Sequence, residues 1–233
     1  LMRLFRFFFS LLVTLSLIWA LSASHSIKGN SLPPLASFFN PFSGFWKNAE
    51  PVNGVKFENG NLKGLKSSVQ VTYDDLLVPH IFAENQLDAV RVQGYITAQY
   101  RLFQMDLTTR KAAGRLSEVM GERTFKLDRA TRRKGMVFAA ENDIVGWSKS
   151  PESMALLEAY AEGVNAWIDQ LKPADYPIEF KLLNYKPEHW SPFKSALVTE
   201  AMAETLCSGE DDIEATNALK YFGKETFDYL YPE

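Results

Sequence analysis

The residue types that most often carry catalysis are sparse in this sequence. The chain has three histidines, His25, His80 and His189, and one cysteine, Cys207. A hydrolytic triad usually needs a histidine as base, but His80 in VPHI and His189 in PEHWSPF are expected to bond or pack locally. A lone thiol near a helix end is more often a small buried hydrophobe than a nucleophile. With no G-x-S-x-G or H-E-x-x-H motif present, the chain is predicted to hold no catalytic residue of its own.

Carboxylates gather in one stretch, SGEDDIEATNALKYFG, beside the expected start of a helix. Glu210, Asp211, Asp212 and Glu214 lie there within five positions. Calcium takes several oxygen ligands and tolerates irregular loops, so a hard-cation site is one interpretation. Stabilisation of the helix dipole by acidic residues is the other. The spacing is not that of an EF-hand loop, and it leaves both interpretations open.

The first residues have the layout of a secretory signal. Arg3 and Arg6 precede an apolar run from about Phe7 to Leu21, and small residues follow. This order of charged start, apolar centre and small residues is typical of a signal peptide, and residues 1–24 are assigned to one. An uncleaved membrane anchor is the alternative, although the run is short for a full span. The protein is therefore expected to be exported, periplasmic or secreted, and in the alternative held at the membrane by this segment.

Length and composition indicate a globular chain with a sizeable core. The 233 residues are 46% apolar and 23% charged, with a formal net charge of −3. That balance offers no general attraction to phosphate backbones, so no nucleic-acid partner is expected. With one cysteine no internal disulfide can form, and stability must come from packing, a metal or another chain.

Apolar periodicity predicts an α+β chain that is mostly helical. Residues 25–66 are rich in proline and aromatic residues and are expected to form an extended arm on a larger body. Alternation in SSVQVTYDD predicts a strand. Apolar or small residues recur every three or four positions from about Gln86 to Ala112, which predicts a long helix ending at Gly114. Further helices are expected from Ser150-Pro151, from Ser191-Pro192 and from about Asp212 to Gly223.

Four segments resemble the penicillin amidase family in sequence and in order. They are YDDLLVPHIFAEN, GYITAQYRLFQMDLTTRKAAGRLSEVMGE, YAEGVNAWID and FKLLNYKPEHWSPFKSALVTEAMAETL. The resemblance runs from about Val69 to Gly223 and implies a domain over residues 67–233, incomplete without a second chain. Members are N-terminal nucleophile hydrolases with a four-layer αββα fold, cut from one precursor into a small and a large chain. This chain resembles the small chain or an N-terminal fragment of the precursor.

The resemblance also implies roles for individual residues. In the family the nucleophile is a serine that begins the large chain, and its own α-amine serves as base. The small chain supplies one carboxylate to a structural calcium shared with the large chain, and EATN places that carboxylate at Glu214. The acyl pocket takes part of its wall from a helix end, here MAETLCSG, so Met202, Thr205 and Leu206 are candidate substrate-binding residues. Ordinary core packing is the alternative for these three.

The chain departs from the family pattern at two positions. The family often has glycine where Leu77 stands and aspartate where Tyr100 stands in AQYRLFQM. Loss of that carboxylate removes a possible ion pair with Arg101. The helix around it is expected to be scaffold, with Arg101, Asp106 and Arg110 tying its turns together.

The expected function is that of a subunit or fragment of an exported amidohydrolase. It would cleave an N-acyl amide of the penicillin or acyl-homoserine lactone type through the serine of the missing large chain. The alternative is a non-catalytic exported binding or structural protein that kept the fold.

Overall fold

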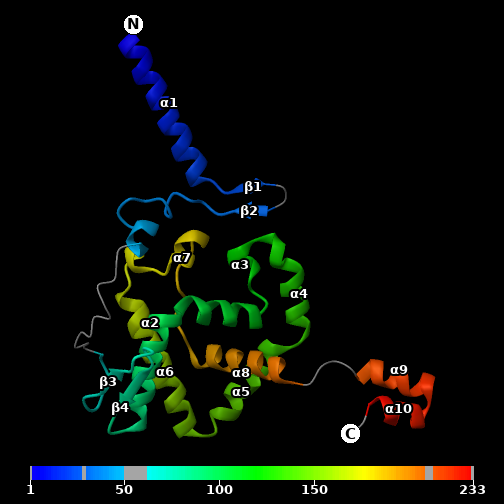
Figure 1. Ribbon diagram of the computed structural model, residues 1–233. Helices are drawn as coiled ribbons and strands as arrows, with labels where there is room; N and C mark the ends of the chain where they lie inside the picture. Colours follow the sequence, from blue (N-terminus) through cyan, green and yellow to red (C-terminus); the bar gives the residue numbers. More distant parts are fainter. Residues whose placement is uncertain (1, 28–29, 50–61, 208–211, 232–233) are drawn as a thin grey trace. The chain divides into compact units, whose positions relative to one another are not determined.

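The computed structural model describes residues 2–27, 30–49, 62–207 and 212–231 (Figure 1). This part of the chain is mostly helical, as the sequence predicts. Its α-helices are α1 (Met2–Ser22), α2 (Gln86–Ala112), α3 (Ser117–Met120), α4 (Phe125–Arg133), α5 (Met136–Trp147), α6 (Pro151–Gln170), α7 (Ile178–Leu183), α8 (Pro192–Leu206), α9 (Asp212–Phe222) and α10 (Lys224–Leu230). Its strands are β1 (His25–Ile27), β2 (Asn30–Leu32), β3 (Gln70–Tyr73) and β4 (Pro79–Phe82), and its 3₁₀ turns are η1 (Phe45–Asn48), η2 (Glu122–Thr124) and η3 (Pro173–Asp175). The strands form two antiparallel hairpins, β1–β2 and β3–β4.

The chain divides into two compact units, Leu1–Ala201 and Met202–Glu233. The first holds the buried core, and the second holds the end of α8 with α9 and α10.

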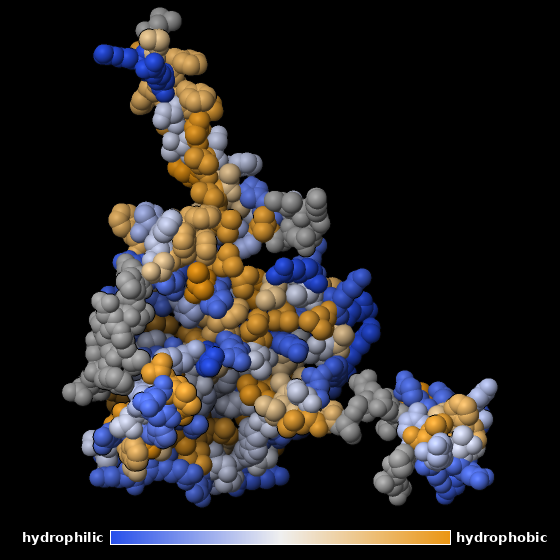
Figure 2. Space-filling model, in the orientation of Figure 1, coloured by the Kyte–Doolittle hydropathy of each residue, from blue (hydrophilic) through white to orange (hydrophobic). Residues whose placement is uncertain are grey.

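Helix α1 is long and apolar enough to cross a membrane, and none of its residues is buried. Figure 2 shows apolar side chains along its length. A signal sequence and a membrane anchor share these properties. The apolar N-terminal helix is therefore consistent with either.

The close crossing of α2 and α6 organises the first unit, and two glycines make it possible. A Cβ at Gly94 would meet the backbone oxygen of Tyr160, and a Cβ at Gly163 would meet that of Arg91. The sequence predicts a close neighbour at Gly94, and α6 is that neighbour. Asn85 caps α2 by accepting the Asp88 N–H at 3.0 Å, and Ser150 caps α6 as predicted.

Two apolar clusters flank this crossing. The larger joins α2, α6, α7 and Trp190, and consists of Ala98, Leu102, Met105, Ala161, Val164, Ile168, Phe180 and Trp190. The smaller joins the end of α2 to α5 and α8 through Ala112, Ala113, Met136, Ala140, Ala196 and Leu197. Gly114, at φ 63°, ends α2 as expected because only glycine adopts that conformation without strain.

The β3–β4 turn contains a strained leucine. Leu77 has φ 61°, in the left-handed region that disfavours residues with a Cβ. Asp74 holds the turn by accepting the N–H groups of Leu76 and Val78 at 2.9 Å each. These bonds and one from His80 keep the pKa of Asp74 below its usual range, with Val78 the largest cause. The glycine common in the family at this position thus has a physical reason.

We predict that Leu77→Gly stabilises the β3–β4 turn. The side chain is 60% exposed, so little packing is lost, and relief of the left-handed strain contributes about 1 kcal/mol. Proteolytic cleavage at the turn should slow by roughly fivefold, because local opening of the turn would require about 1 kcal/mol more free energy. Leu76→Gly, at an exposed neighbour whose φ is not positive, is the control and should not slow cleavage. Equal behaviour of the two variants would contradict the prediction.

A buried lysine attaches part of the N-terminal segment to α7. The Lys181 ammonium donates to the Gly44 carbonyl at 3.1 Å, the Asn48 side chain at 2.6 Å and the Ala174 carbonyl at 2.8 Å. Burial lowers the pKa of Lys181, with Asp175 opposing that shift. All three ammonium protons are therefore used, and two of them hold residues 44–48 against the helical body.

We predict that Lys181→Met releases this attachment. Three buried or half-buried oxygens lose their donor, which costs about 1–3 kcal/mol. Limited proteolysis within residues 30–49 should accelerate by about tenfold or more. Lys186→Met, at an exposed lysine, is the matched control. Unchanged cleavage in Lys181→Met would show that other contacts, such as the bonds from Ser37 to Asn184 and from Asn48 to the Tyr176 carbonyl, hold the segment without it.

Candidate functional site

Two of the three histidines, His80 and His189, pair with carboxylates at the surface. His80 Nε2 lies 3.3 Å from Asp74 Oδ2, and His189 Nε2 lies 2.7 Å from Asp169 Oδ1. In the described part of the chain, neither imidazole hydrogen-bonds a serine, threonine or cysteine side chain. A base without a nucleophile within reach cannot activate one.

The expectation that Cys207 is buried is wrong. Cys207 is exposed, with its Sγ 3.1 Å from the Glu204 carbonyl oxygen. It directly follows α8, whose buried residues, Ala196 and Leu197, lie in its first half. The last turn of the helix therefore has no core to cover the thiol.

The carboxylate stretch is described only in part. Glu214 is exposed in α9, while Glu210, Asp211 and the side chain of Asp212 lie outside the described residues. Within the described ranges no three His, Cys, Asp or Glu side chains are grouped to hold a metal. Glu214 fits calcium as a single hard oxygen donor, so the remaining ligands would have to come from elsewhere.

The three candidate pocket residues lie in the last turns of α8. Met202 is 54% exposed and Leu206 75% exposed, and Thr205 is exposed as well. Large exposed apolar side chains at a helix end are available to line a surface formed with another chain. None of the three lines the cavity described next.

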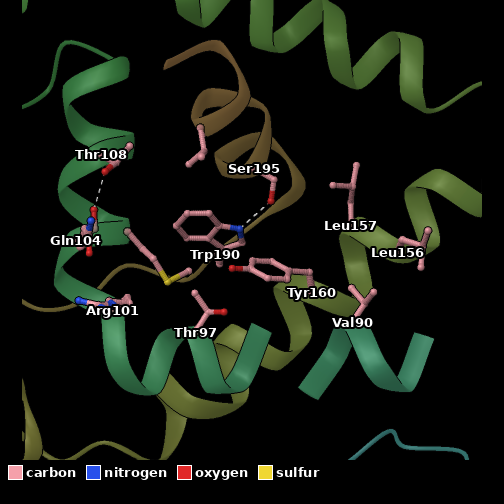
Figure 3. Close-up of a pocket in the computed structure, with 12 residues that line it drawn as sticks. Val90, Thr97, Arg101, Gln104, Thr108, Leu156, Leu157, Tyr160, Trp190 and Ser195 are labelled. Atoms are coloured by element: carbon pink, nitrogen blue, oxygen red, sulfur yellow. Dashed lines mark hydrogen bonds between the residues drawn. The ribbon is translucent and has the colours of Figure 1, made fainter. Parts of the chain in front are cut away.

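A cavity of about 560 Å³ opens between α2, α6 and the start of α8 (Figure 3). Its lining residues are Val90, Thr97, Arg101, Gln104, Met105, Thr108, Leu156, Leu157, Tyr160, Trp190, Ser195 and Val198. Trp190 Nε1 donates to Ser195 Oγ at 2.9 Å, which fixes the indole in the wall. Burial raises the pKa of Tyr160, and a hydrogen bond with Thr97 opposes that shift. The cavity is mostly apolar with a few polar groups, as ligand and peptide sites often are.

A buried ion network lies near the end of α2. Arg110 Nε donates to Asp106 Oδ2 at 2.8 Å, and both side chains are 4% exposed. Tyr185 donates its hydroxyl to the same oxygen at 2.9 Å. The other guanidinium nitrogens of Arg110 reach Glu118 at 2.9 Å and Glu188 at 2.8 Å.

Two more cations complete this network. Arg115 bonds both Glu118 and Glu188, and Lys194 lies 3.2 Å from Glu188. Burial acts to raise the pKa of Glu188, but Arg115, Lys194 and Arg110 together lower it to about 2. The stability that Glu188 contributes is therefore present above its ordinary pKa and lost as the pH falls toward about 2. The network connects α2, α3, the segment before α8 and α8 itself.

The penicillin amidase family model matches residues 68–233. The chain belongs to the penicillin amidase family. It is 40% identical over 138 residues to penicillin acylase 2 proenzyme of Pseudomonas sp. (strain SE83), covering 59% of this chain and 17% of that protein. It is 34% identical over 152 residues to penicillin G acylase of Escherichia coli, covering 64% of this chain and 18% of that protein.

Two further matches define which part of a penicillin amidase this chain represents. It is 31% identical over 183 residues to acyl-homoserine lactone acylase QuiP of Pseudomonas aeruginosa, covering 78% of this chain and 21% of that protein. A solved chain of thermostable penicillin G acylase from Alcaligenes faecalis matches with a TM-score of 0.59 and 28% identity, covering 70% of this chain and 90% of that chain. The chain thus spans about a fifth of the length of the curated relatives it matches.

Arg101 does not tie turns of the penicillin amidase helix together, contrary to expectation. It has φ −134° and ψ 15°, which breaks the helical geometry of α2 at this residue. Its exposed side chain makes no hydrogen bond or ion pair with any described residue. Tyr100, which replaces the common aspartate, instead packs edge-on against Tyr73 with ring centroids 6.3 Å apart. Burial is the main cause that raises the pKa of Tyr73 to about 12, and a hydrogen bond with Tyr100 adds to it.

Sequence reasoning missed the cavity because its walls come from distant segments. Tyr160 and Trp190 sit in YAEGVNAWID and PEHWSPF, segments that carry the family resemblance without indicating a shared surface. The i, i+4 spacing of Asp106 and Arg110 indicated their pairing. Nothing in the sequence indicated Tyr185 and Glu188 as their further partners.

Proposed function

We propose that this chain is the small subunit of an exported two-chain amidohydrolase that cleaves N-acyl amides. The observation that carries the proposal is coverage: the chain accounts for 90% of a solved penicillin acylase chain but about a fifth of the curated relatives. Within the described residues, neither His80 nor His189 has a nucleophile beside it. This supports a catalytic group supplied by another chain.

In this proposal the serine that begins the large chain attacks the acyl carbon. Its α-amine takes the hydroxyl proton and passes it to the departing amine, and water then releases the acyl group as a carboxylic acid. Met202, Thr205 and Leu206 would form part of the acyl-binding wall. The exposed methionine and leucine favour an apolar acyl group, such as phenylacetyl or a medium fatty acyl chain.

The proposal is tested by expressing the whole open reading frame that encodes this chain. We expect the complete protein to release nitroaniline from phenylacetyl or octanoyl p-nitroanilide, and the 233-residue chain alone to release none. Replacing the first serine of the large chain with alanine should abolish the activity. The proposal would be contradicted if this chain alone hydrolysed either substrate, or if the complete protein were inactive on both. The second result would favour a non-catalytic protein that kept the fold.

We also propose that Glu214 supplies one ligand to a structural calcium shared with the large chain. Its support is an exposed carboxylate in α9 with the residue pattern EATN. Bound calcium would cross-link the two chains, with no part in acyl transfer.

We predict that Glu214→Ala lowers calcium content and slows precursor maturation. Because one charged ligand of several is lost, calcium affinity should fall by roughly 10–100-fold, within the range that ligand charge sets. The acyl-transfer rate of whatever protein matures should stay within about twofold, since the side chain would not touch the reacting atoms. Glu225→Ala, in the first turn of α10, is the control. Normal calcium content with normal maturation would remove Glu214 from the site.

A further inference from the structure

An unpaired arginine stands at the rim of the cavity between α2, α6 and α8. The break in α2 lies at Arg101 itself, and Arg101 is one of the cavity's lining residues. A guanidinium carries a fixed positive charge and five N–H donors in a planar fork that matches a carboxylate. Arg110, nine positions later in Gln86–Ala112, bonds three carboxylates, whereas Arg101 has no partner in the described chain.

The threonine hydroxyls on this side of the cavity are already engaged. Thr97 donates to the Gln93 carbonyl at 2.7 Å, and Thr108 donates to the Gln104 carbonyl at 2.8 Å. Thr97 lies before the break in α2, Gln104 and Thr108 lie after it, and all three line the cavity together with Arg101 (Figure 3). Among these four residues Arg101 carries the one charged side chain.

The wall beside these four residues is apolar. Leu157 and Tyr160 come from α6, and Trp190 precedes α8 (Figure 3). Met105 comes from α2. The volume of about 560 Å³ accommodates several side chains of an extended or helical segment. An apolar cavity with one cation at its rim fits a segment in which an acidic residue is flanked by apolar ones.

We propose that this cavity receives a segment of the large chain, whose aspartate or glutamate forms an ion pair with Arg101. The inference rests on the proposed function, because it requires a large chain to be present. Roughly four fifths of each curated relative lies outside the region matched here, so most of the polypeptide in such an enzyme is available to cover this face. The broken helix at Arg101 projects the guanidinium to the surface where that segment would lie.

The first test measures assembly of the two chains expressed from the complete reading frame, with an affinity tag on the large chain. Arg101→Met should weaken recovery of the small chain by about tenfold, and Arg101→Glu by about a hundredfold, because a charge pair at an interface becomes a repulsion. Arg133→Met is the matched control, since Arg133 is an exposed arginine in α4 without a described ion pair. Circular dichroism of each small chain shows whether the variant keeps its helices.

A second measurement identifies the occupant. A photo-reactive benzoylphenylalanine at Gln104, exposed beside Arg101, should crosslink to a large-chain peptide that contains an aspartate or glutamate. Reversing that carboxylate to arginine should restore assembly of Arg101→Glu. Any of three results would overturn the inference. The first is a crosslink to a second copy of this chain, and the second is no crosslink in the assembled protein. The third is equal assembly of Arg101→Glu and the control. If the wild-type chains do not assemble at all, the proposed function itself fails and the inference with it.

Discussion

Replacing Arg110 with methionine destabilises the helical core by about 3–5 kcal/mol, because it leaves a buried carboxylate without its cation. Asp106 is 4% exposed and would retain only the Tyr185 hydroxyl as a partner. Its second oxygen, Oδ1, is buried and has no hydrogen-bond partner in the described structure, so it can supply no compensating bond. Glu118 and Glu188 would each lose a cation as well.

Hydrogen exchange of the α2 amides in the assembled protein measures this loss. Protection factors should fall by roughly two to three orders of magnitude, the equivalent of about 3–4 kcal/mol. Arg115→Met is the matched control: Arg115 bonds the same two glutamates but is 37% exposed, so its loss should cost about 1 kcal/mol or less. An Arg110→Met loss no larger than that of Arg115→Met would contradict the prediction.

A double variant distinguishes the stability lost by leaving a buried charge unpaired from the stability lost through poorer packing. Asp106→Leu combined with Arg110→Met leaves no lone charge inside, and apolar replacement of both partners of a buried pair is often close to neutral. The double variant should therefore be less destabilised than Arg110→Met alone. If the destabilisation of the double variant equals the sum of those of Asp106→Leu and Arg110→Met, the interaction between Asp106 and Arg110 contributes little stability of its own.

The main helices were predictable because their core faces repeat. Leu102, Met105 and Thr109 are buried in α2 at the spacing that the sequence shows. The proline and serine signals placed the starts of α6 and α8 correctly. Period and capping are local properties, and both α2 and α6 are long enough to display them.

Helices α4 and α5 were missed because they lack that repeat. In α4 the buried residues are polar, Asp128 and Thr131. Asp128 accepts the N–H groups of Leu116 and Ser117, a role that no periodicity indicates. In α5 the apolar residues begin as a contiguous run, MVFAA, which does not distinguish a helix from a strand.

The candidate site was predictable only through resemblance. Met202, Thr205, Leu206 and Glu214 were chosen by motif, and they remain proposals. The strain at Leu77 shows what resemblance adds: the family's glycine marked this position, and the φ of 61° supplies the physical reason. Arg101 shows its limit, because it was expected to tie turns of the helix together, whereas α2 breaks at this residue and the side chain is exposed.

Residues 25–233 by themselves should not unfold in one sharp cooperative transition. Residues 202–233 form a compact unit of their own that is too small to bury a stable core without disulfides or a partner. Ile213 is 71% exposed, and Tyr221 and Tyr229 are each 83% exposed, so α9 and α10 leave most of their apolar surface in water. Such surface indicates a missing partner chain.

Urea unfolding of residues 25–233, followed by fluorescence and circular dichroism, tests this expectation against the assembled two-chain protein. In the isolated chain, amides of α9 and α10 should exchange at nearly unprotected rates, while those at the α2–α6 crossing keep protection, because the crossing packs on a buried core whereas no described residue of α9 or α10 is buried. In the assembled protein both regions should be protected. A single steep transition in the isolated chain, with the two probes coincident, would mean that its exposed apolar side chains need no cover. The requirement for a second chain would then rest on catalysis alone.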